Sequence, residues 1–345
     1  MMRASRIEEL MSAMKSFGNE KYEKSELLTE MLTLQREIVE LTFNDEHAST
    51  ADLKIWDVER HLEQMNQDCG NVADEELEKF KNGSKTLCNL IKAEISGARG
   101  EAKAFRTLQK IRSKNIVLKN VELSDEDTRT ELDAIVIMSG AISIIEVKNT
   151  AKDVFIDEDG NYFRTGEFLR WDCNIAEKMS IKETLLRKVL EDNGVQDVQI
   201  RNIVVFTDTR IEIQNRYSGI RTCFVSQLPY IIGGFKGIRQ MTDEEMGAAE
   251  AAIKNAESKE AYPFEFDVDQ YKRDFATLMA ILEEASAQKE VVKQNDEADD
   301  HNIRTWFLLR SLLKTKFGGN AVAAATVTVV STVAMNAIRK GGIFR

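Results

Sequence analysis

The chain has 345 residues, with 58 Asp and Glu against 47 Lys and Arg and a formal net charge of −11. This length, with 43% hydrophobic residues, is enough to bury a sizeable core and excludes a disordered or collagen-like chain. The four cysteines form no CxxC pair, so neither a disulfide framework nor a structural zinc site is indicated. The three histidines lie far apart, which argues against zinc hydrolases and Ser-His-Asp chemistry. Catalysis would therefore depend on carboxylates and lysines.

Residues 1–95 form an acidic region that is predicted to be helical, with 12 Lys and Arg against 20 Asp and Glu. Apolar residues alternate at spacings of four and three between Leu27 and Leu41, and a similar pattern covers Ile55 to Val72. A helical hairpin and one long interrupted helix fit this pattern equally well. Its apolar seam would serve either an oligomerising coiled coil or ordinary packing between helices. The N-terminus lacks the apolar run of a signal peptide, so we expect a cytoplasmic protein.

Residues 96–235 change to a mixed pattern that predicts an α/β domain. Gly97 and Gly100 are expected to break the preceding helix. The order of the following elements predicts a small mixed sheet flanked by helices. These elements are a helix over 102–112, strands over 116–123, 132–138 and 142–147, a helix over 175–191, and strands over 203–206 and 223–225.

Residues 236–300 are predicted to be helical again, with a capping box at Thr242 and Glu245. Residues 301–345 form a basic tail that holds seven Lys and Arg and no acid. Within it, 321–338 is an uncharged stretch of 18 residues. As a helix it would reach roughly 27 Å at 1.5 Å per residue, close to the thickness of a hydrocarbon core. Membrane association, a soluble helix buried in an oligomer, and a strand remain open for this segment.

Two carboxylates are predicted to meet in a hairpin between the second and third strands. The Ser139-Gly140 pair suits a two-residue turn, which pairs Met138 with Ala141 and, further along, brings Asp133 opposite Glu146. Directly opposed carboxylates repel each other, so the chain must raise a pKa, supply a cation or tolerate the repulsion. Oxygen ligands of this kind suit Mg²⁺. The hairpin therefore predicts a metal site for phosphoryl chemistry.

Strand alternation places Lys148 on the same face as Glu146. There its amine is close enough to orient or deprotonate an attacking water, or to stabilise charge on a phosphate. The same register sets Lys148 opposite Glu131, so an ordinary cross-strand ion pair is the alternative.

The motif residues resemble the NERD (nuclease-related domain) family of the PD-(D/E)xK superfamily. The matching positions are Gly100-Glu101, Leu132-Asp133 and the run Glu146-Val147-Lys148-Asn149, and the resemblance covers about 96–232. It implies a restriction-endonuclease-like fold in which Asp133 and Glu146 bind a divalent metal and the Val147 carbonyl assists. It also implies that Lys148 serves the nucleophilic water and that Glu101 adds a further carboxylate.

The chain departs from this family near the second core helix. The family often has a Pro and a Gln there, whereas this chain has Trp171 to Asn174 followed by Glu177-Lys178. Two motif residues also have structural alternatives, since Glu101 would suit the first turn of a helix and Asn149 would suit the end of a strand. The acidic residues 157–161 invite a calcium hypothesis, but the residues around them fit a hairpin turn better.

The leading hypothesis is a Mg²⁺- or Mn²⁺-dependent nuclease that hydrolyses phosphodiester bonds of nucleic acid, with DNA favoured over RNA. The first alternative is a non-catalytic coiled-coil scaffold whose nuclease-like domain binds nucleic acid or a partner. The second is a metal-dependent hydrolase of nucleotides. An acidic chain attracts a polyanion poorly, so local basic residues would have to compensate. The candidates are Lys103, Arg106, Lys110, Arg112, Lys114, Arg170 and Lys178.

Overall fold

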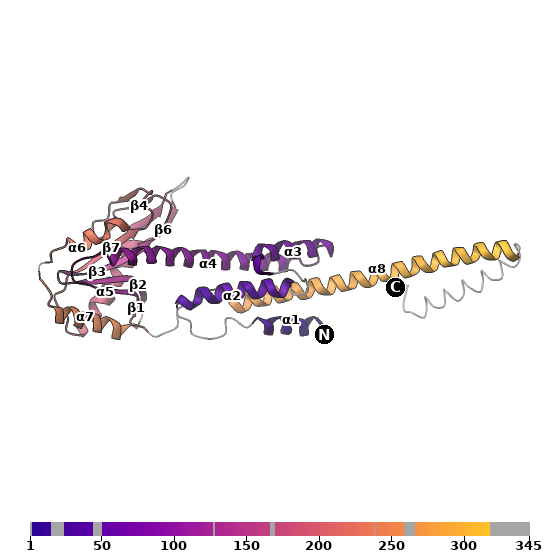
Figure 1. Cartoon of the computed structure of the whole chain (residues 1–345), viewed down its shortest axis with the longest axis horizontal. Coiled ribbons are helices and arrows are strands. Elements are labelled where there is room, and N and C mark those ends of the chain that lie inside the picture. Colours follow the sequence, from indigo (N-terminus) through magenta and orange to yellow (C-terminus); the bar gives the residue numbers. More distant parts are fainter. Residues whose placement is uncertain are drawn as a thin grey trace. The chain divides into compact units, whose positions relative to one another are not determined.

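The computed structural model describes most of the chain (Figure 1). The predicted apolar segment 321–338 lies outside the described residues. The described ranges are 2–14, 24–43, 50–126, 128–165, 170–237, 239–258 and 266–317.

The chain divides into two compact units. The helical unit takes its described residues from 1–15, 35–84 and 267–345, and the α/β unit takes them from 16–34 and 85–266. Both helices predicted near the N-terminus are present as separate elements, although α2 has residues in both units. Their bounds, with those of the remaining helices of this part of the chain, are α1 (Met2–Ala13), α2 (Lys24–Phe43), η1 (Thr50–Asp52), α3 (Ile55–Asp68) and α8 (Val268–Phe317).

The helical unit has an aromatic core in which the Phe80 ring stacks on Tyr271 at 5.6 Å and lies 5.5 Å from Phe275. The hydroxyls of Tyr271 and Ser84 share a hydrogen bond of 2.8 Å in this core. Among the helices of the described residues, none has a stretch that is both long and apolar enough to cross a membrane.

Helix α4 (Asp74–Leu108) runs without interruption through the two glycines that were expected to break it. That prediction is wrong. A Cβ on Gly100 would lie 2.9 Å from the Cβ of Asn149, so the glycine allows α4 to approach the residue after β3 closely. A helical glycine costs about 1 kcal/mol relative to alanine, and the remaining hydrogen bonds and packing of a long helix offset it.

The α/β unit is built around a five-stranded sheet in the order β1-β2-β3-β7-β9. The first three strands are antiparallel, whereas β3, β7 and β9 are parallel. The strands predicted for this sheet are all present. Their bounds are β1 (Ile116–Ser124), β2 (Arg129–Met138), β3 (Ala141–Lys148), β7 (Ile200–Phe206) and β9 (Arg221–Phe224).

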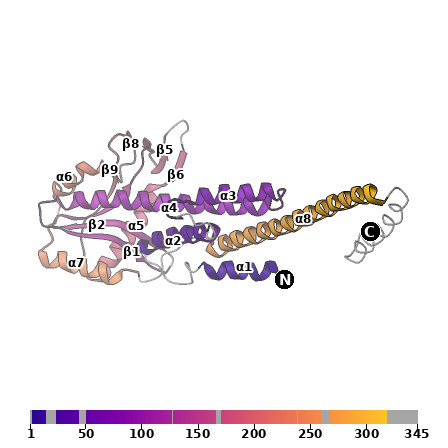
Figure 2. The same ribbon diagram turned by 45° about the vertical axis from the view of Figure 1, so that its right-hand side comes forward.

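Helices cover both faces of this sheet (Figures 1 and 2). On one face, α5 (Ile175–Asp192) and α7 (Asp243–Ala256) pack against buried residues such as Ile135 and Ile137. On the other face, the end of α4 and the short α6 (Leu228–Gly233), which follows η2 (Val225–Gln227), pack against Ala134 and Val136. The architecture is therefore mixed α/β with helical regions, as predicted, and fits a restriction-endonuclease-like core.

A second sheet of four strands, in the order β6-β5-β4-β8, was not predicted. Its strands are too short to show a clear alternation in the sequence. Residues 157–160 of the acidic segment form the turn between β4 and β5, where the Asp157 carboxylate accepts hydrogen bonds from the N–H groups of Asp159 and Asn161 at 3.0 and 2.8 Å. The expected hairpin turn is thus present. The strands are β4 (Val154–Ile156), β5 (Asn161–Arg164), β6 (Arg170–Asn174) and β8 (Ile213–Asn215).

Candidate active site

The β2–β3 hairpin has the predicted register, from Met138 opposite Ala141 to Ala134 opposite Ile145. Asp133 precedes Ala134 in β2, directly beyond the last paired residues. At this position the contact with β3 is made by the side chain of Asp133. Its Oδ2 accepts a hydrogen bond of 2.7 Å from the N–H of Val147. The carboxylate is thereby fixed beside the last residues of β3.

Glu146 is buried and surrounded by ammonium groups. Its Oε1 lies 2.9 Å from the Nζ of Lys148 and 3.1 Å from the Nζ of Lys178. Its Oε2 forms a short ion pair with Lys182, whose Nζ also lies 4.0 Å from Oδ1 of Asp133. The predicted Asp133, Glu146 and Lys148 therefore do come together, and two lysines of α5 join them.

Lys182 was not predicted as a site residue, and Lys178 was expected only as a basic residue that could attract nucleic acid. The two lysines are four residues apart, so they lie on one face of α5. Lys182 is 1% exposed and stands in the apolar stripe of the helix between Met179 and Leu186. Fully buried lysines are rare unless they are paired. In the sequence, a lysine at an apolar core position of this helix indicates that a buried acid lies nearby. Here that acid is Glu146.

The charges of the cluster act on one another. Burial raises the pKa of Asp133, and the nearby Glu146 raises it further, to about 6. Burial alone would also raise the pKa of Glu146, but Lys182, Lys148 and Lys178 together hold it well below its usual range. Burial lowers the pKa of Lys148, yet its ion pair with Glu146 outweighs this and raises it above the ordinary value. These directions of the pKa shifts favour a carboxylate at Glu146 and an ammonium group at Lys148 at neutral pH.

Glu101 lies in the interior of α4, so the expected role in the first turn of a helix is wrong for this residue. Its charge contributes to the raised pKa of Asp133, which places the two carboxylates in the same neighbourhood. Glu101 is therefore near the site, although its predicted catalytic role stays a prediction.

Asn149 directly follows β3, and its side chain bonds to two other parts of the chain. Its Nδ2 donates to the backbone carbonyl and hydroxyl oxygens of Ser96 at 2.9 and 3.1 Å. Its Oδ1 accepts a short hydrogen bond from the hydroxyl of Thr207, the residue after β7. Together with the close contact at Gly100, these bonds tie α4, β3 and β7 together beside the carboxylates.

The donor atoms suit a divalent cation. Oxygens of Asp133 and Glu146, from neighbouring strands, both face one positive charge, the Lys182 ammonium. Two such carboxylates are typical ligands of Mg²⁺. No group of three or more His, Cys, Asp or Glu side chains able to hold a metal occurs within the described ranges. Any ion bound here would thus rely on two side chains with backbone or water oxygens.

No curated protein and no solved structure matches the chain. A family model does match part of it, namely the nuclease-related domain, NERD, over residues 96–207. This stretch contains Glu101, Asp133, Glu146 and Lys148, and it covers less than half of the 345 residues. Residues 96–207 are therefore similar to the nuclease-related domain family.

Proposed function

We propose that this protein is a metal-dependent nuclease that hydrolyses phosphodiester bonds of nucleic acid, DNA rather than RNA. The observation that carries the proposal is the convergence of Asp133 and Glu146 on one cationic position beside Lys148. The family match adds that the domain is nuclease-related.

Asp133 and Glu146 would hold Mg²⁺ or Mn²⁺, with the carbonyl of Val147 as a further oxygen ligand. An ion held there would supply Lewis-acid polarisation of the phosphate and of the attacking water. The Lys182 ammonium pairs with Glu146 and lies 4.0 Å from Oδ1 of Asp133, so it would have to move aside for both carboxylates to hold an ion. The flexible four-carbon stem of lysine allows such a movement.

Lys148 is the residue that we expect to contact the substrate. Its side chain is 20% exposed, whereas that of Glu146 is 3% exposed, so the ammonium reaches towards solvent from a buried partner. A fixed ammonium group stabilises the negative charge that develops on the phosphate and orients the water by hydrogen bonding. Glu101 would add a carboxylate that helps to position this water.

A second candidate function is a non-catalytic module that binds nucleic acid. The observation in its favour is the ion-pair network itself, because three lysines already neutralise the buried Glu146. Such a cluster is stable without a metal. Metal binding and cleavage assays separate this candidate from the nuclease.

The deciding experiment incubates the full-length protein with linear, circular and single-stranded DNA and with RNA, in Mg²⁺, Mn²⁺ or EDTA. We expect cleavage of DNA that requires the metal and is lost in Asp133→Asn and Lys148→Met. Lys254→Met is the matched control, because Lys254 forms only a surface ion pair with Glu250. Circular dichroism verifies that each variant is folded.

Two results would contradict the proposal. Cleavage that survives in both Asp133→Asn and Lys148→Met would remove the assigned residues. Tight binding of DNA by the wild-type protein without any cleavage, whatever the metal, would favour the non-catalytic module.

A further inference from the structure

A surface hollow of about 410 Å³ opens beside the candidate active site, at the ends of β3 and β7. We call it the basic hollow. Asn149 directly follows β3, and Thr207 directly follows β7, which is parallel to β3. In α/β sheets, ligands commonly bind at the carboxyl ends of parallel strands. The basic hollow is lined by Arg99, Lys103, Asn149, Thr207, Asp208 and Arg210, among others.

The basic hollow is joined directly to the backbone of the proposed catalytic lysine. The N–H of Thr207 donates to the carbonyl oxygen of Lys148 at 3.1 Å. The side chain of Thr207 is bonded in turn to Asn149. A group held in the basic hollow would therefore be positioned by the same strand ends that carry Glu146 and Lys148.

Positive groups in the basic hollow have capacity left for an anion. Arg99 is exposed, and its side chain has no hydrogen-bond or ion-pair partner among the described residues. Lys103 donates to the carbonyl of Thr207, which uses one of the three N–H donors of an ammonium group. The one carboxylate of the lining, Asp208, is bound in a bidentate pair by Arg210 at 2.9 and 2.6 Å. The lining thus carries three cations against one acid, within a chain whose net charge is −11.

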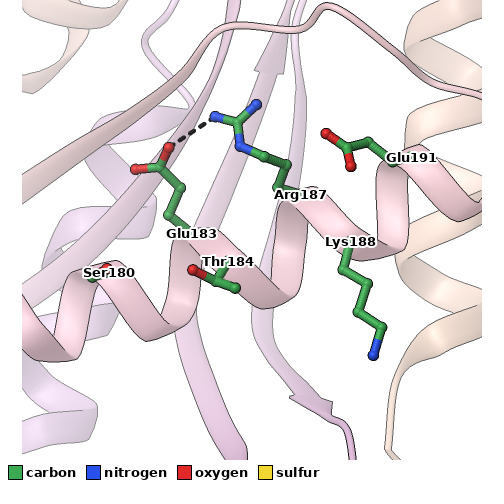
Figure 3. A pocket seen from close by; sticks show the side chains of 6 residues that line it. All are labelled: Ser180, Glu183, Thr184, Arg187, Lys188 and Glu191. Carbon is green, nitrogen blue, oxygen red and sulfur yellow. Dashed lines mark hydrogen bonds and ion pairs between the residues drawn. The ribbon is translucent and has the colours of Figure 1, made fainter.

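A second hollow of the same volume, about 410 Å³, lies on α5 and offers an internal comparison (Figure 3). Its lining includes two cations, Arg187 and Lys188, and two acids, Glu183 and Glu191. Arg187 donates to Glu183 at 2.8 Å, as the dashed line in Figure 3 shows. The formal charges of these four residues sum to zero, so we do not expect the α5 hollow to attract an anion.

We propose that the basic hollow is a subsite for a backbone phosphate of the nucleic-acid strand, next to the phosphate that is cleaved. Arg99 and Lys103, one helical turn apart on α4, would contact the phosphate oxygens. The Asn149 and Thr207 contacts hold the wall in place. This inference rests on the proposed function, since it assigns part of the substrate to a position beside Lys148.

The test compares two double variants of the full-length protein that remove the same charge. Arg99→Gln with Lys103→Gln alters the basic hollow, and Arg187→Gln with Lys188→Gln alters the α5 hollow. Binding of fluorescein-labelled DNA and RNA strands is measured by fluorescence anisotropy in EDTA, over a range of salt concentrations. Inorganic phosphate and a nucleoside monophosphate serve as competitors.

We expect the basic-hollow variant to bind strands about 10-fold more weakly, with a salt slope reduced by about one for each lost contact. The α5 variant should bind like the wild type. With Mg²⁺ present, the basic-hollow variant should show a raised KM and an unchanged kcat, because it loses uniform binding of the strand. If the double variant does not fold, Arg99→Gln alone serves, since Arg99 is exposed and unpaired among the described residues.

The outcomes distinguish the two proposals. Equal weakening by both double variants would overturn the basic hollow as a subsite, even if the wild-type protein cleaves DNA. The absence of any strand binding by the wild-type protein would overturn it as well. Strand binding that depends on Arg99 and Lys103, in a protein that never cleaves, would retain the subsite and contradict the nuclease.

Discussion

The two ends of the β2–β3 hairpin differ in the interactions that join the two strands. From the turn to the pair Ala134 and Ile145, the strands are joined by a regular ladder of mostly apolar residues, and helices cover both faces. One residue further, the ladder ends and the side chain of Asp133 bonds to the Val147 N–H instead. The closed end is thus an ordinary hydrophobic core, and the open end is a buried cluster of charges.

This difference shows which end serves folding and which serves chemistry. Burying apolar side chains stabilises the fold at roughly 25 cal/mol per Å². Burying charges costs desolvation, and even well-paired buried ions are often replaceable by apolar residues without loss of stability. The polar end is therefore poorly explained by stability alone. It is well explained by a site that binds a cation.

The largest effect is expected for Asp133→Asn, which should lower cleavage activity by about 100-fold or more. The same change should stabilise the metal-free protein. The pKa of Asp133 is raised from 3.8 to about 6, so the folded protein prefers the protonated acid. Its stability contribution is present below the unfolded pKa and lost as the pH rises through the folded pKa. Above pH 6, removing the charge should recover on the order of 2–3 kcal/mol.

Urea unfolding of wild type and Asp133→Asn in EDTA, from pH 4 to pH 8, measures this effect. The difference in the free energy of unfolding should grow with pH and level off above about pH 6. A variant that is less stable than the wild type at pH 8 would show that the carboxylate serves the fold.

Lys182→Met should destabilise the metal-free protein by about 3–5 kcal/mol, because it leaves buried carboxylates without their closest cation. Lys178→Met is the matched control on the same helix face. Lys178 is 45% exposed, so the loss of its ion pair should cost about 1 kcal/mol or less. Added Mg²⁺ should raise the melting temperature of Lys182→Met by more than that of the wild type, since the ion no longer has to displace an ammonium group. Equal shifts would mean that Lys182 does not compete with the metal.

Gly100→Ala tests whether the approach of α4 to the open end matters. Alanine is the better helix former by about 1 kcal/mol, yet its Cβ would lie 2.9 Å from the Cβ of Asn149. We expect a net loss of about 1–2 kcal/mol together with lower activity, because overpacking displaces the residues that fix β3. Gly247→Ala in α7, where a Cβ would meet nothing within 4 Å, should instead stabilise the protein. Thermal unfolding of the pair gives the comparison, and a stabilised Gly100→Ala would refute the packing argument.

The smallest effect is expected at the closed end of the hairpin. Ile144→Val removes one methylene group from a fully buried residue and should cost about 0.5–1.5 kcal/mol. Because Ile144 belongs to the apolar cluster of the sheet, kcat should not change. A large change in kcat would show that the apolar ladder and the charged cluster are coupled.

The sequence revealed the hairpin and its three motif residues because their signals are local. A two-residue turn sets the register, and alternation then places Glu146 and Lys148 on one face. Local signals could not predict the role of Lys182, because its partner Glu146 lies on another element, far away in the sequence. Only its place in an apolar stripe pointed to a buried acid. The second sheet was missed because strands as short as Val154–Ile156 carry almost no periodic signal.

The glycines of α4 show the opposite limitation. Local propensity predicted a break at Gly97 and Gly100, but the helix continues because tertiary packing outweighs a preference of about 1 kcal/mol. Asn149 belongs to the motif that carries the resemblance, whereas its bonds to Ser96 and Thr207 follow from the meeting of three elements. Contacts between elements far apart in the sequence depend on the tertiary structure, so local patterns do not predict them.

The one-turn spacing of Lys178 and Lys182 gives Glu146 two counterions with different access to dissolved salt. Lys178 is half exposed, so ions in solution compete for its charge and weaken the pair as ionic strength rises. Lys182 is shut away from water, and its pair with Glu146 is largely insensitive to the surrounding electrolyte. Without a bound metal, Glu146 therefore has one counterion that dissolved salt hardly affects and one that it screens.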